Sequence, residues 1–324
     1  MTGHIPEGSS GFNTGSVSMS KNPEFPDFKP IELQDLHFLH EILRQYQPRV
    51  SEWTFTNLFI WRTLYGFQWS LYKEWLMVIC REGNNGFYAM EPIGPPSRRE
   101  PAVTLLEWLW QEKNSPDPRI ERADKSLASE LDGLKNLTVE PAREHFDYVY
   151  LRDDLVALTG NKYRSKRNHI NQLFRSYKFE YEALKQHHID ECLKLQEKWC
   201  ILKRCEEDLN LSSEWEAVRE ILHHYKALNL KGGVVTVEKE VMAFTIGELL
   251  NNDTAVVHIE KADPDIPGLY QIVNQQFCEK TWENVLYINR EQDLGLPGLR
   301  EAKLSYYPHH FVEKYRIRLN RQPE

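Results

Sequence analysis

The chain has 324 residues, which is more than one small hydrophobic core needs and suits two domains. Apolar residues make up 41% of the chain and aromatic residues 12%, enough for a packed interior, so the composition excludes wholesale disorder. The formal charge of −8 also argues against a general nucleic-acid-binding protein.

The beginning of the chain predicts a tail. Residues 1–27 are rich in Gly, Ser, Asn and Pro and show no hydrophobic periodicity, so we expect them to be disordered. The N-terminus lacks the charged and then apolar pattern of a secretory signal, and no apolar run reaches the ~18 residues that a bilayer requires. We therefore expect a cytoplasmic protein. Peripheral contact with lipid and the oligomeric state are left open by the sequence.

From residue 28 onward, the first half of the chain reads as two helices, three strands and then alternating helices and strands. Leu36, Leu39, Leu43 and Tyr46, for example, repeat at helical spacing. The expected helices cover residues 36–46, 56–64, 102–112 and 125–134. The expected strands cover residues 67–72, 75–81, 87–90, 119–122, 137–140 and 148–151.

The second half repeats this order, and a capping box at Ser213 and Glu216 predicts the start of one of its helices. The expected helices begin near residue 189 and cover residues 213–228, 267–282 and 297–304. The expected strands cover residues 233–238, 241–250, 254–260, 285–289 and 311–319. Antiparallel hairpins followed by a strand–helix–strand unit predict an α/β protein (α+β, with mixed sheets) that carries helices on both faces. We place the two halves at residues 28–155 and 156–324.

Two long strings of sequence sharpen this pattern. Residues 150–174 read YLRDDLVALTGNKYRSKRNHINQLF, and residues 288–308 read INREQDLGLPGLREAKLSYYP. Together with the element order, they resemble signature segments of the family named for the C-terminal domain of phosphatidylglycerol lysyltransferase, over residues 28–319. The resemblance implies two tandem GNAT-like domains related to Fem-type aminoacyl transferases. Lysyltransferase members move an aminoacyl group from a charged tRNA to a lipid headgroup, but no membrane-spanning region is expected here, so the acceptor is left open.

A basic segment is the first candidate for binding chemistry. Residues 162–178 contain six Lys and Arg residues and no acidic residue, in a chain that is acidic as a whole. We interpret Lys162, Arg164, Lys166 and Arg167 as a cradle for the phosphates of a donor, either tRNA or CoA. The alternative is a solvated helix face between the two halves.

The segment after the expected strand 285–289 is the second candidate, because sites in α/β sheets form beyond the carboxyl ends of strands. A carboxylate there can accept a proton from an attacking amine or hydroxyl, and a tyrosine can protonate the leaving group. The catalytic candidates in this segment are Glu291, Asp293 and Tyr307. The substrate-binding candidates are Asn289, Arg300, Lys303 and Tyr306. The alternative is a structural loop in which Asp293 caps the next helix or pairs with Arg300.

Two neighbouring strands supply a third set of candidates. Glu248, His258 and Glu260 are expected to line the central cleft, and His258 and Glu260 share one side because strand residues alternate. A histidine beside a carboxylate can act as a base, and the alternative is a satisfied interior pair. The residues expected to border one cleft are Glu248, His258, Asp293, Arg300, Lys303 and Tyr307.

The absence of one motif narrows the choice of donor. GNAT proteins that use acetyl-CoA usually carry a Gln/Arg-x-x-Gly-x-Gly/Ala turn that binds pyrophosphate at a helix N-terminus, whereas residues 261–271 read KADPDIPGLYQ. We therefore favour aminoacyl-tRNA over acyl-CoA as the donor of an acyl or aminoacyl transferase that acts on an amine or hydroxyl. The alternative is a GNAT-derived binding or regulatory protein without turnover. No metal site is expected, because the His-His pairs lack partner cysteines and HExxH spacing.

Overall fold

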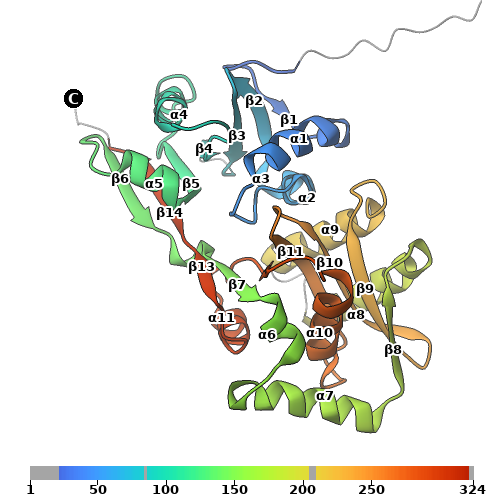
Figure 1. The fold of residues 1–324 in the computed structure, drawn as a ribbon. Helices are drawn as coiled ribbons and strands as arrows, with labels where there is room; N and C mark the ends of the chain where they lie inside the picture. Colours follow the sequence, from blue (N-terminus) through green and yellow to red (C-terminus); the bar gives the residue numbers. More distant parts are fainter. Residues whose placement is uncertain (1–21, 84–85, 204–208, 321–324) are drawn as a thin grey trace, which may run out of the picture.

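The computed structural model describes residues 22–83, 86–203 and 209–320, which form two α/β halves (Figure 1). The first half contains α1 (Leu36–Tyr46), α2 (Phe55–Ile60), α3 (Arg62–Tyr65), α4 (Arg99–Gln111) and α5 (Lys125–Leu131). Its strands are β1 (Lys29–Pro30), β2 (Gln68–Tyr72), β3 (Trp75–Arg81), β4 (Phe87–Met90), β5 (Arg119–Asp124) and β6 (Leu137–Pro141). With β14 (Lys314–Leu319), from the end of the described chain, these six strands form a seven-stranded sheet in the order β1-β2-β3-β4-β5-β14-β6.

The second half is built on another seven-stranded sheet, in the order β13-β7-β12-β11-β10-β9-β8. Its helices are α6 (Arg152–Ala157), α7 (Arg164–Ser176), α8 (Ile189–Lys203), α9 (Leu209–His223), α10 (Leu269–Thr281) and α11 (Pro297–Leu304). The remaining strands are β7 (Asp147–Leu151), β8 (Phe179–Ala183), β9 (Lys231–Val237), β10 (Glu240–Leu249), β11 (Thr254–Ala262), β12 (Tyr287–Asn289), β13 (His310–Val312) and β14 (Lys314–Leu319). Across the parts of the chain that the structure describes, no helix has both the length and the apolar character needed to cross a membrane.

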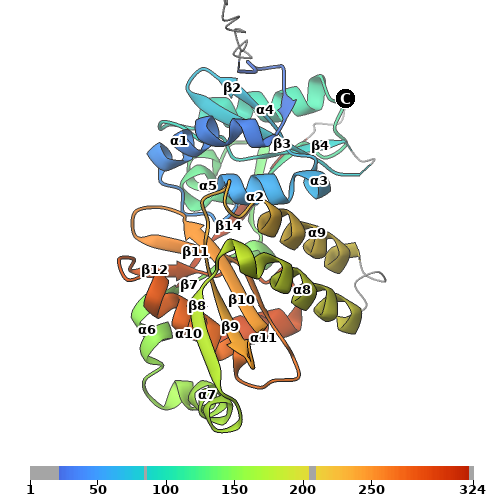
Figure 2. The ribbon, with the colours of Figure 1, turned by 90° about the vertical axis from the view of Figure 1, so that its right-hand side faces the viewer.

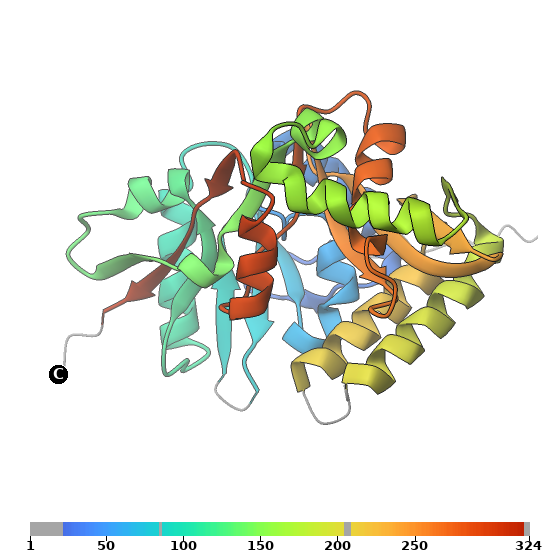
Figure 3. The same cartoon turned by 90° about the horizontal axis from the view of Figure 1, so that it is seen from below.

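Both sheets are mixed, as the sequence predicted. Within the described strands, each sheet has one parallel pair, β4 with β5 and β11 with β12, and its other pairs are antiparallel. Helices α8 and α9 lie side by side along the second half in Figure 2, and α7 runs across the end of that half in the view from below (Figure 3).

The two halves exchange their last strands, which differs from the expected strand placement. β7 was expected to close the first sheet, but it pairs with β12 and β13 in the second sheet. The expected strand 311–319 is divided at Glu313 into β13 and β14, and β14 inserts between β5 and β6 of the first sheet. The sequence does not reveal this exchange, because strand pairing depends on distant segments rather than on local pattern.

Several local elements also differ from expectation. α9 begins at Leu209, so Ser213 lies inside the helix and the predicted capping box is wrong. The expected helix 56–64 is divided at Trp61 into α2 and α3, and β8 was not predicted. Residues 1–21 of the expected tail lie outside the described residues. Residues 22–27 are ordered beside β2, where the Phe25 N–H donates to the Leu71 backbone oxygen. The Phe25 ring packs against Trp108 of α4, with 5.6 Å between ring centroids.

The hydrophobic core continues from one half into the other. One cluster joins α1, α2, β2 and β3 to α8, α9, β9 and β10. Where α2 meets α9, the Phe59 and His224 rings pack edge to face at 5.0 Å, and Arg62 pairs with Glu220 at 2.6 Å. Alternate residues of β10 face this cluster and a second one that contains α10, so helices cover both faces of the second sheet. This shared packing sets the position of the two halves.

Candidate active site

A cleft opens where the parallel strands β11 and β12 diverge. The two strands pair over three residues, the last of them Val256 and Asn289, after which β11 continues to Ala262 while the chain leaves β12. The cleft has a volume of about 540 Å³ and is lined by side chains of both halves. Crevices beyond the carboxyl ends of strands are where α/β sheets place their sites, so this cleft is the candidate active site.

Glu291 borders the cleft and links the two halves. Its Oε1 accepts hydrogen bonds from His258 Nδ1 and from Asn57 Nδ2 of the first half, each at 2.9 Å. Oε2 has no hydrogen-bond partner within the described part of the chain, and the side chain is 18% exposed. The backbone of Glu291 is left-handed, with a φ of 56°, a conformation that a non-glycine residue adopts at a cost of about 1 kcal/mol or more.

His258 lies between two carboxylates. Its second ring nitrogen, Nε2, is 3.0 Å from Glu248 Oε1. Burial alone lowers the pKa of His258, but its hydrogen bonds to Glu248 and Glu291 outweigh burial and raise the pKa to about 9. At neutral pH both ring nitrogens therefore donate, so His258 holds the two carboxylates in place and has no lone pair with which to act as a base.

Lys303 reaches the same cleft from α11. Its ammonium donates to the backbone oxygens of Arg290 and Glu291, the second at 3.2 Å, and the residue is 9% exposed. Burial lowers the pKa of Lys303 to about 8, and the neighbouring charge of Arg290 acts in the same direction. An ammonium has three donors, so one N–H of Lys303 is available to a ligand.

Two further cations gather around the ring of Tyr306. Arg290 lies 4.9 Å and Lys166 4.2 Å from the ring centroid. Arg290 NH2 donates to Glu260 at 2.8 Å, whereas its buried NH1 has no partner in the structure described. Lys166 donates to the Ser305 hydroxyl at 2.6 Å, and burial followed by the charge of Arg290 lowers its pKa. This side of the cleft is therefore suited to an anionic group.

Asp293 lies outside the cleft, against the expectation that it borders it. Its fully buried carboxylate accepts two hydrogen bonds from Arg300, at 2.8 and 3.0 Å, and others from Tyr148 and the Gly295 N–H. Burial alone raises the pKa of Asp293, but these hydrogen bonds outweigh it and lower the pKa to about 2. The structure thus contains the alternative ion pair with Arg300, and so low a pKa makes Asp293 a poor base at neutral pH.

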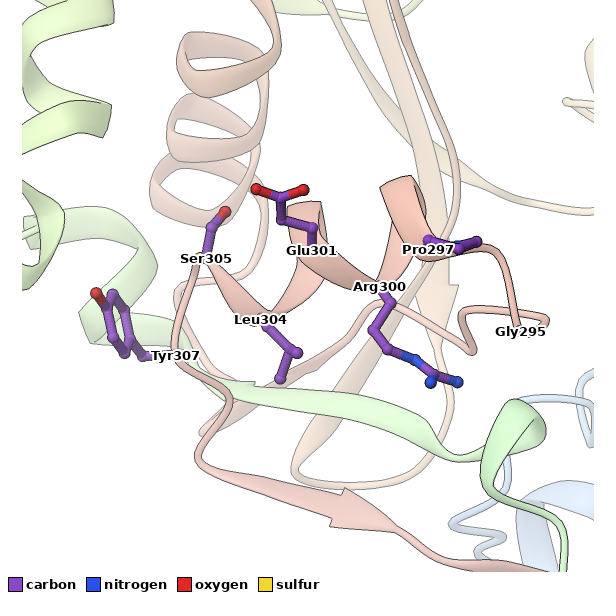
Figure 4. Close-up of a pocket in the computed structure, with 7 residues that line it drawn as sticks. All are labelled: Gly295, Pro297, Arg300, Glu301, Leu304, Ser305 and Tyr307. Atoms are coloured by element: carbon purple, nitrogen blue, oxygen red, sulfur yellow. The ribbon is translucent and has the colours of Figure 1, made fainter.

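α11 and the turn that follows it separate residues that were expected to lie together. Lys303 and Tyr306 face the cleft, whereas Arg300 and Tyr307 border another hollow on the outer side of the helix (Figure 4). Glu248 is not among the cleft-lining residues and contacts the cleft through His258. Asn289 is fully buried and donates to Asp147 at 3.1 Å, which makes it a structural anchor beside the site.

The basic segment forms α7 and the turn before it, and only part of it reaches the cleft. Of the four predicted phosphate ligands, Lys166 lines the cleft. Lys162 pairs with Asp154 at 3.3 Å, and Arg167 donates to the backbone oxygens of residues 158 and 160. Arg164 is exposed and is not among the residues that line the cleft.

The sequence did not indicate the first-half residues that line the cleft. They include Glu52, Asn57, Trp61, Tyr65 and Arg122. Arg122 has a φ of 57° and is 3.1 Å from Glu52, at a point where the pairing of β5 with β14 is irregular. The only signal for Arg122 in the sequence is that it ends an expected strand. Arg290 has a similar place in the second half, directly after the expected strand 285–289.

The corresponding position in the first half is filled by its own side chains. Where β4 and β5 diverge, Glu91 accepts hydrogen bonds from Trp53 at 3.0 Å and Arg98 at 2.9 Å, and Arg98 also donates to Asp124 at 2.6 Å. Burial, followed by the charge of Asp124, raises the pKa of Glu91 to about 8. This buried network closes the position that is open in the second half.

One group of metal-ligand residue types lies away from the cleft, at Glu182, His187 and His188. His188 Nδ1 accepts a hydrogen bond from the Lys185 backbone N–H at 3.0 Å, which places the ring proton on Nε2, 3.4 Å from Glu182. In this tautomer Nε2 carries the proton and has no lone pair to offer a metal. The arrangement is that of a hydrogen-bonded pair.

A mixed sheet with a diverging parallel pair, present in each of two similarly ordered halves, defines a tandem GNAT-type protein. The chain belongs to the family described as phosphatidylglycerol lysyltransferase, C-terminal, which matches residues 43–318. The family predicted from the two sequence strings is thereby confirmed.

Solved structures agree with this assignment. A conserved protein of unknown function from Bacteroides thetaiotaomicron VPI-5482 is 34% identical, with a TM-score of 0.84 over 90% of this chain and 99% of that one. L-PGS from Bacillus licheniformis is 12% identical, with a TM-score of 0.60 over 93% of this chain and 94% of that one. FemX is 7% identical, with a TM-score of 0.53 over 90% of this chain and 96% of that one. The last two similarities establish the shared fold.

Proposed function

We propose that the chain transfers an acyl or aminoacyl group from an activated donor to an amine or hydroxyl acceptor, in the cleft between its halves. The observation that carries this proposal is that one cleft holds two complementary groups. Glu291 offers a carboxylate with a free oxygen, and Lys303 offers a buried ammonium. The family and the fold support the reaction class. The identity of donor and acceptor is part of the proposal.

The residues of the cleft can support each step of acyl transfer. The acceptor N–H or O–H gives its proton to Glu291 Oε2 as its nitrogen or oxygen bonds to the donor carbonyl carbon. The carbonyl oxygen becomes an oxyanion, which Lys303 stabilises from a largely buried position where charge interactions are strong. The oxyanion then reforms the carbonyl, the bond to the leaving group breaks, and the leaving oxygen or sulfur takes the proton held by Glu291.

Aminoacyl-tRNA remains the favoured donor, ahead of acyl-CoA. At the turn where CoA-dependent GNAT proteins bind pyrophosphate, Asp263 is buried and pairs with Lys198 at 2.6 Å. A Cβ on Gly268 would lie 2.4 Å from the backbone oxygen of His169, so α7 lies directly against the start of α10. An acidic and crowded turn disfavours pyrophosphate. The cations near Tyr306 are instead suited to a phosphate or another anion of the donor.

The test is a transfer assay with labelled aminoacyl-tRNA and labelled acyl-CoA, on the wild type and two variants. Glu291→Gln keeps the shape of the side chain but removes the base, so transfer per folded molecule should fall by about two orders of magnitude or more. Lys303→Met should also abolish transfer, whereas Lys135→Met, at an exposed position, should not change it. Equal transfer by the wild type and Glu291→Gln would refute the assignment of the base. Donor binding without turnover by the wild type would favour the non-catalytic alternative.

A further inference from the structure

Asn57, on α2 of the first half, carries an acceptor that nothing in the described residues satisfies. The side chain is 6% exposed, and its Nδ2 donates to the Ser51 backbone oxygen at 2.7 Å and to Glu291 Oε1 at 2.9 Å. Its Oδ1 is buried and has no partner. The orientation of the amide is fixed by these contacts, since exchanging oxygen and nitrogen would set Oδ1 against two other acceptors.

A buried acceptor without a partner destabilises the fold, so its presence in a cleft points to a ligand with a donor. Other groups beside Asn57 favour a donor that is also positively charged. Glu248 and Glu291 both contact the one ring of His258, so two carboxyl groups flank a single basic side chain. Glu291 Oε2 is available in addition to Asn57 Oδ1, so a ligand here would meet two acceptors.

Trp61 supplies an aromatic wall beside these acceptors. It lies four residues after Asn57, so the two side chains share one face of the helical segment, and both line the cleft. Within the described part of the chain, no Lys or Arg lies over the Trp61 ring, whereas Arg122 already lies 5.2 Å from Tyr65. Indole is the strongest of the aromatic partners for a cation.

We propose that Asn57, Glu291 and Trp61 form a binding corner for a primary ammonium group of the substrate. The inference rests on the proposed transfer function and assigns the first half a direct role in recognition. An ammonium donates three N–H groups, two of which Asn57 Oδ1 and Glu291 Oε2 can accept, while its charge faces the indole. The ammonium can belong to the transferred aminoacyl group, because Glu291 Oε2 has two lone pairs and can accept from the acceptor as well. It can also belong to an amine acceptor, which gives one proton to Oε2 before its nitrogen attacks.

Ligand-observed NMR titrations of the full chain at pH 6.5 test the inference with three probes. L-alanine methyl ester carries an ammonium beside an ester, N-acetyl-L-alanine methyl ester carries the same ester without the charge, and propylamine carries the ammonium alone. The free ester should bind about tenfold or more tightly than the N-acetyl ester, the value of a hydrogen-bonded charge. Propylamine binding equal to that of the free ester would assign the corner to an acceptor amine, and much weaker binding would assign it to the aminoacyl group.

Variants then locate the effect. Asn57→Leu removes the acceptor at similar volume and should reduce the preference for the free ester by about tenfold, whereas Asn136→Leu, at an exposed position of the first half, should leave it unchanged. Trp61→Leu should weaken binding of the free ester and leave that of the N-acetyl ester as it is. Equal binding of the two esters by the wild type would overturn the inference, and that comparison needs no variant to fold.

The outcome separates this inference from the proposed function. A chain that prefers the free ester but transfers no acyl group would refute the transferase and leave the ammonium corner standing. A chain that transfers free and N-acetylated aminoacyl groups equally well, with equal binding of the two esters, would remain a transferase and refute the corner.

Discussion

Replacing Asp293 with Asn should reduce the stability of the fold and leave transfer per folded molecule nearly unchanged. The carboxylate is fully buried among donors from Arg300, Tyr148 and the Gly295 backbone. An amide cannot balance the charges of Arg300 and Arg143, which lies 3.2 Å from Asp293. The interactions that Asp293→Asn removes therefore stabilise the fold and do not involve the residues that line the cleft.

The pKa of Asp293 sets the size of the effect. Its fall from 3.8 to about 2 corresponds to about 2 to 3 kcal/mol of folding free energy at neutral pH. Because the pKa is lower in the folded state, this stability is present above pH 3.8 and is lost as the pH falls through about 2. The difference in unfolding free energy between wild type and Asp293→Asn should thus be constant from pH 7 to about 4 and shrink below that.

Urea unfolding between pH 7 and pH 3, with the transfer assay at pH 7, measures both quantities. Asp132→Asn changes an exposed carboxylate and is the control, which should leave both stability and transfer at the wild-type values. An Asp293→Asn variant as stable as the wild type, with transfer reduced a hundredfold, would refute the structural role and restore Asp293 as the base.

Three further experiments address the cleft. Because the pKa of Lys303 is lowered to about 8, transfer should fall as the pH rises above that value. Lys303→Arg should remove this fall, and an unchanged pH profile in the variant would refute the role of Lys303 in transfer. Lys166→Glu should weaken donor binding and flatten its salt dependence, while Arg164→Glu, outside the cleft, should do so much less; equal effects would show that the whole basic face binds the donor. The pKa of His258 is raised from 6.5 to about 9, so its contribution to stability is complete below pH 6.5 and is lost as the pH rises through 9. Urea unfolding of His258→Gln should show the wild-type advantage shrinking over that range, and a constant difference would contradict the ion-paired arrangement.

Local pattern predicts the elements of this fold well, since periodicity and end signals lie within each segment. α11 was expected at residues 297–304 and occupies Pro297–Leu304, with a proline in its first turn as the start signal. The strand exchange could not be predicted in this way, because β7 and β14 find their partners in distant segments. Side-chain direction on α11 was also misjudged. Arg300 and Lys303 are three residues apart and were placed on one side, yet they border different hollows.

The site could be predicted in its location more than in its composition. Glu291 was a candidate because polar residues follow a buried strand there, and the structure brings it together with His258, since β11 and β12 are parallel neighbours. Asp293 was included because residue type alone does not show that Arg300 and Tyr148 already satisfy it. Asn57 was missed for the opposite reason, because nothing in its own segment indicates that the second half lies against it.

The exchanged strands explain how a residue of the first half can serve a site in the second. Lys314, the first residue of β14, is fully buried and pairs with Asp147 of β7 at 2.6 Å and with Glu52 at 2.5 Å. Asp147 also accepts hydrogen bonds from Ser51 and Asn289, so one buried ion pair joins the segment before α2 to the end of β12. A buried pair of this kind contributes little net stability but imposes one geometry, because any other leaves a charge unpaired. That geometry sets α2 against the residues that follow β12, which is the contact that the proposed cleft chemistry requires.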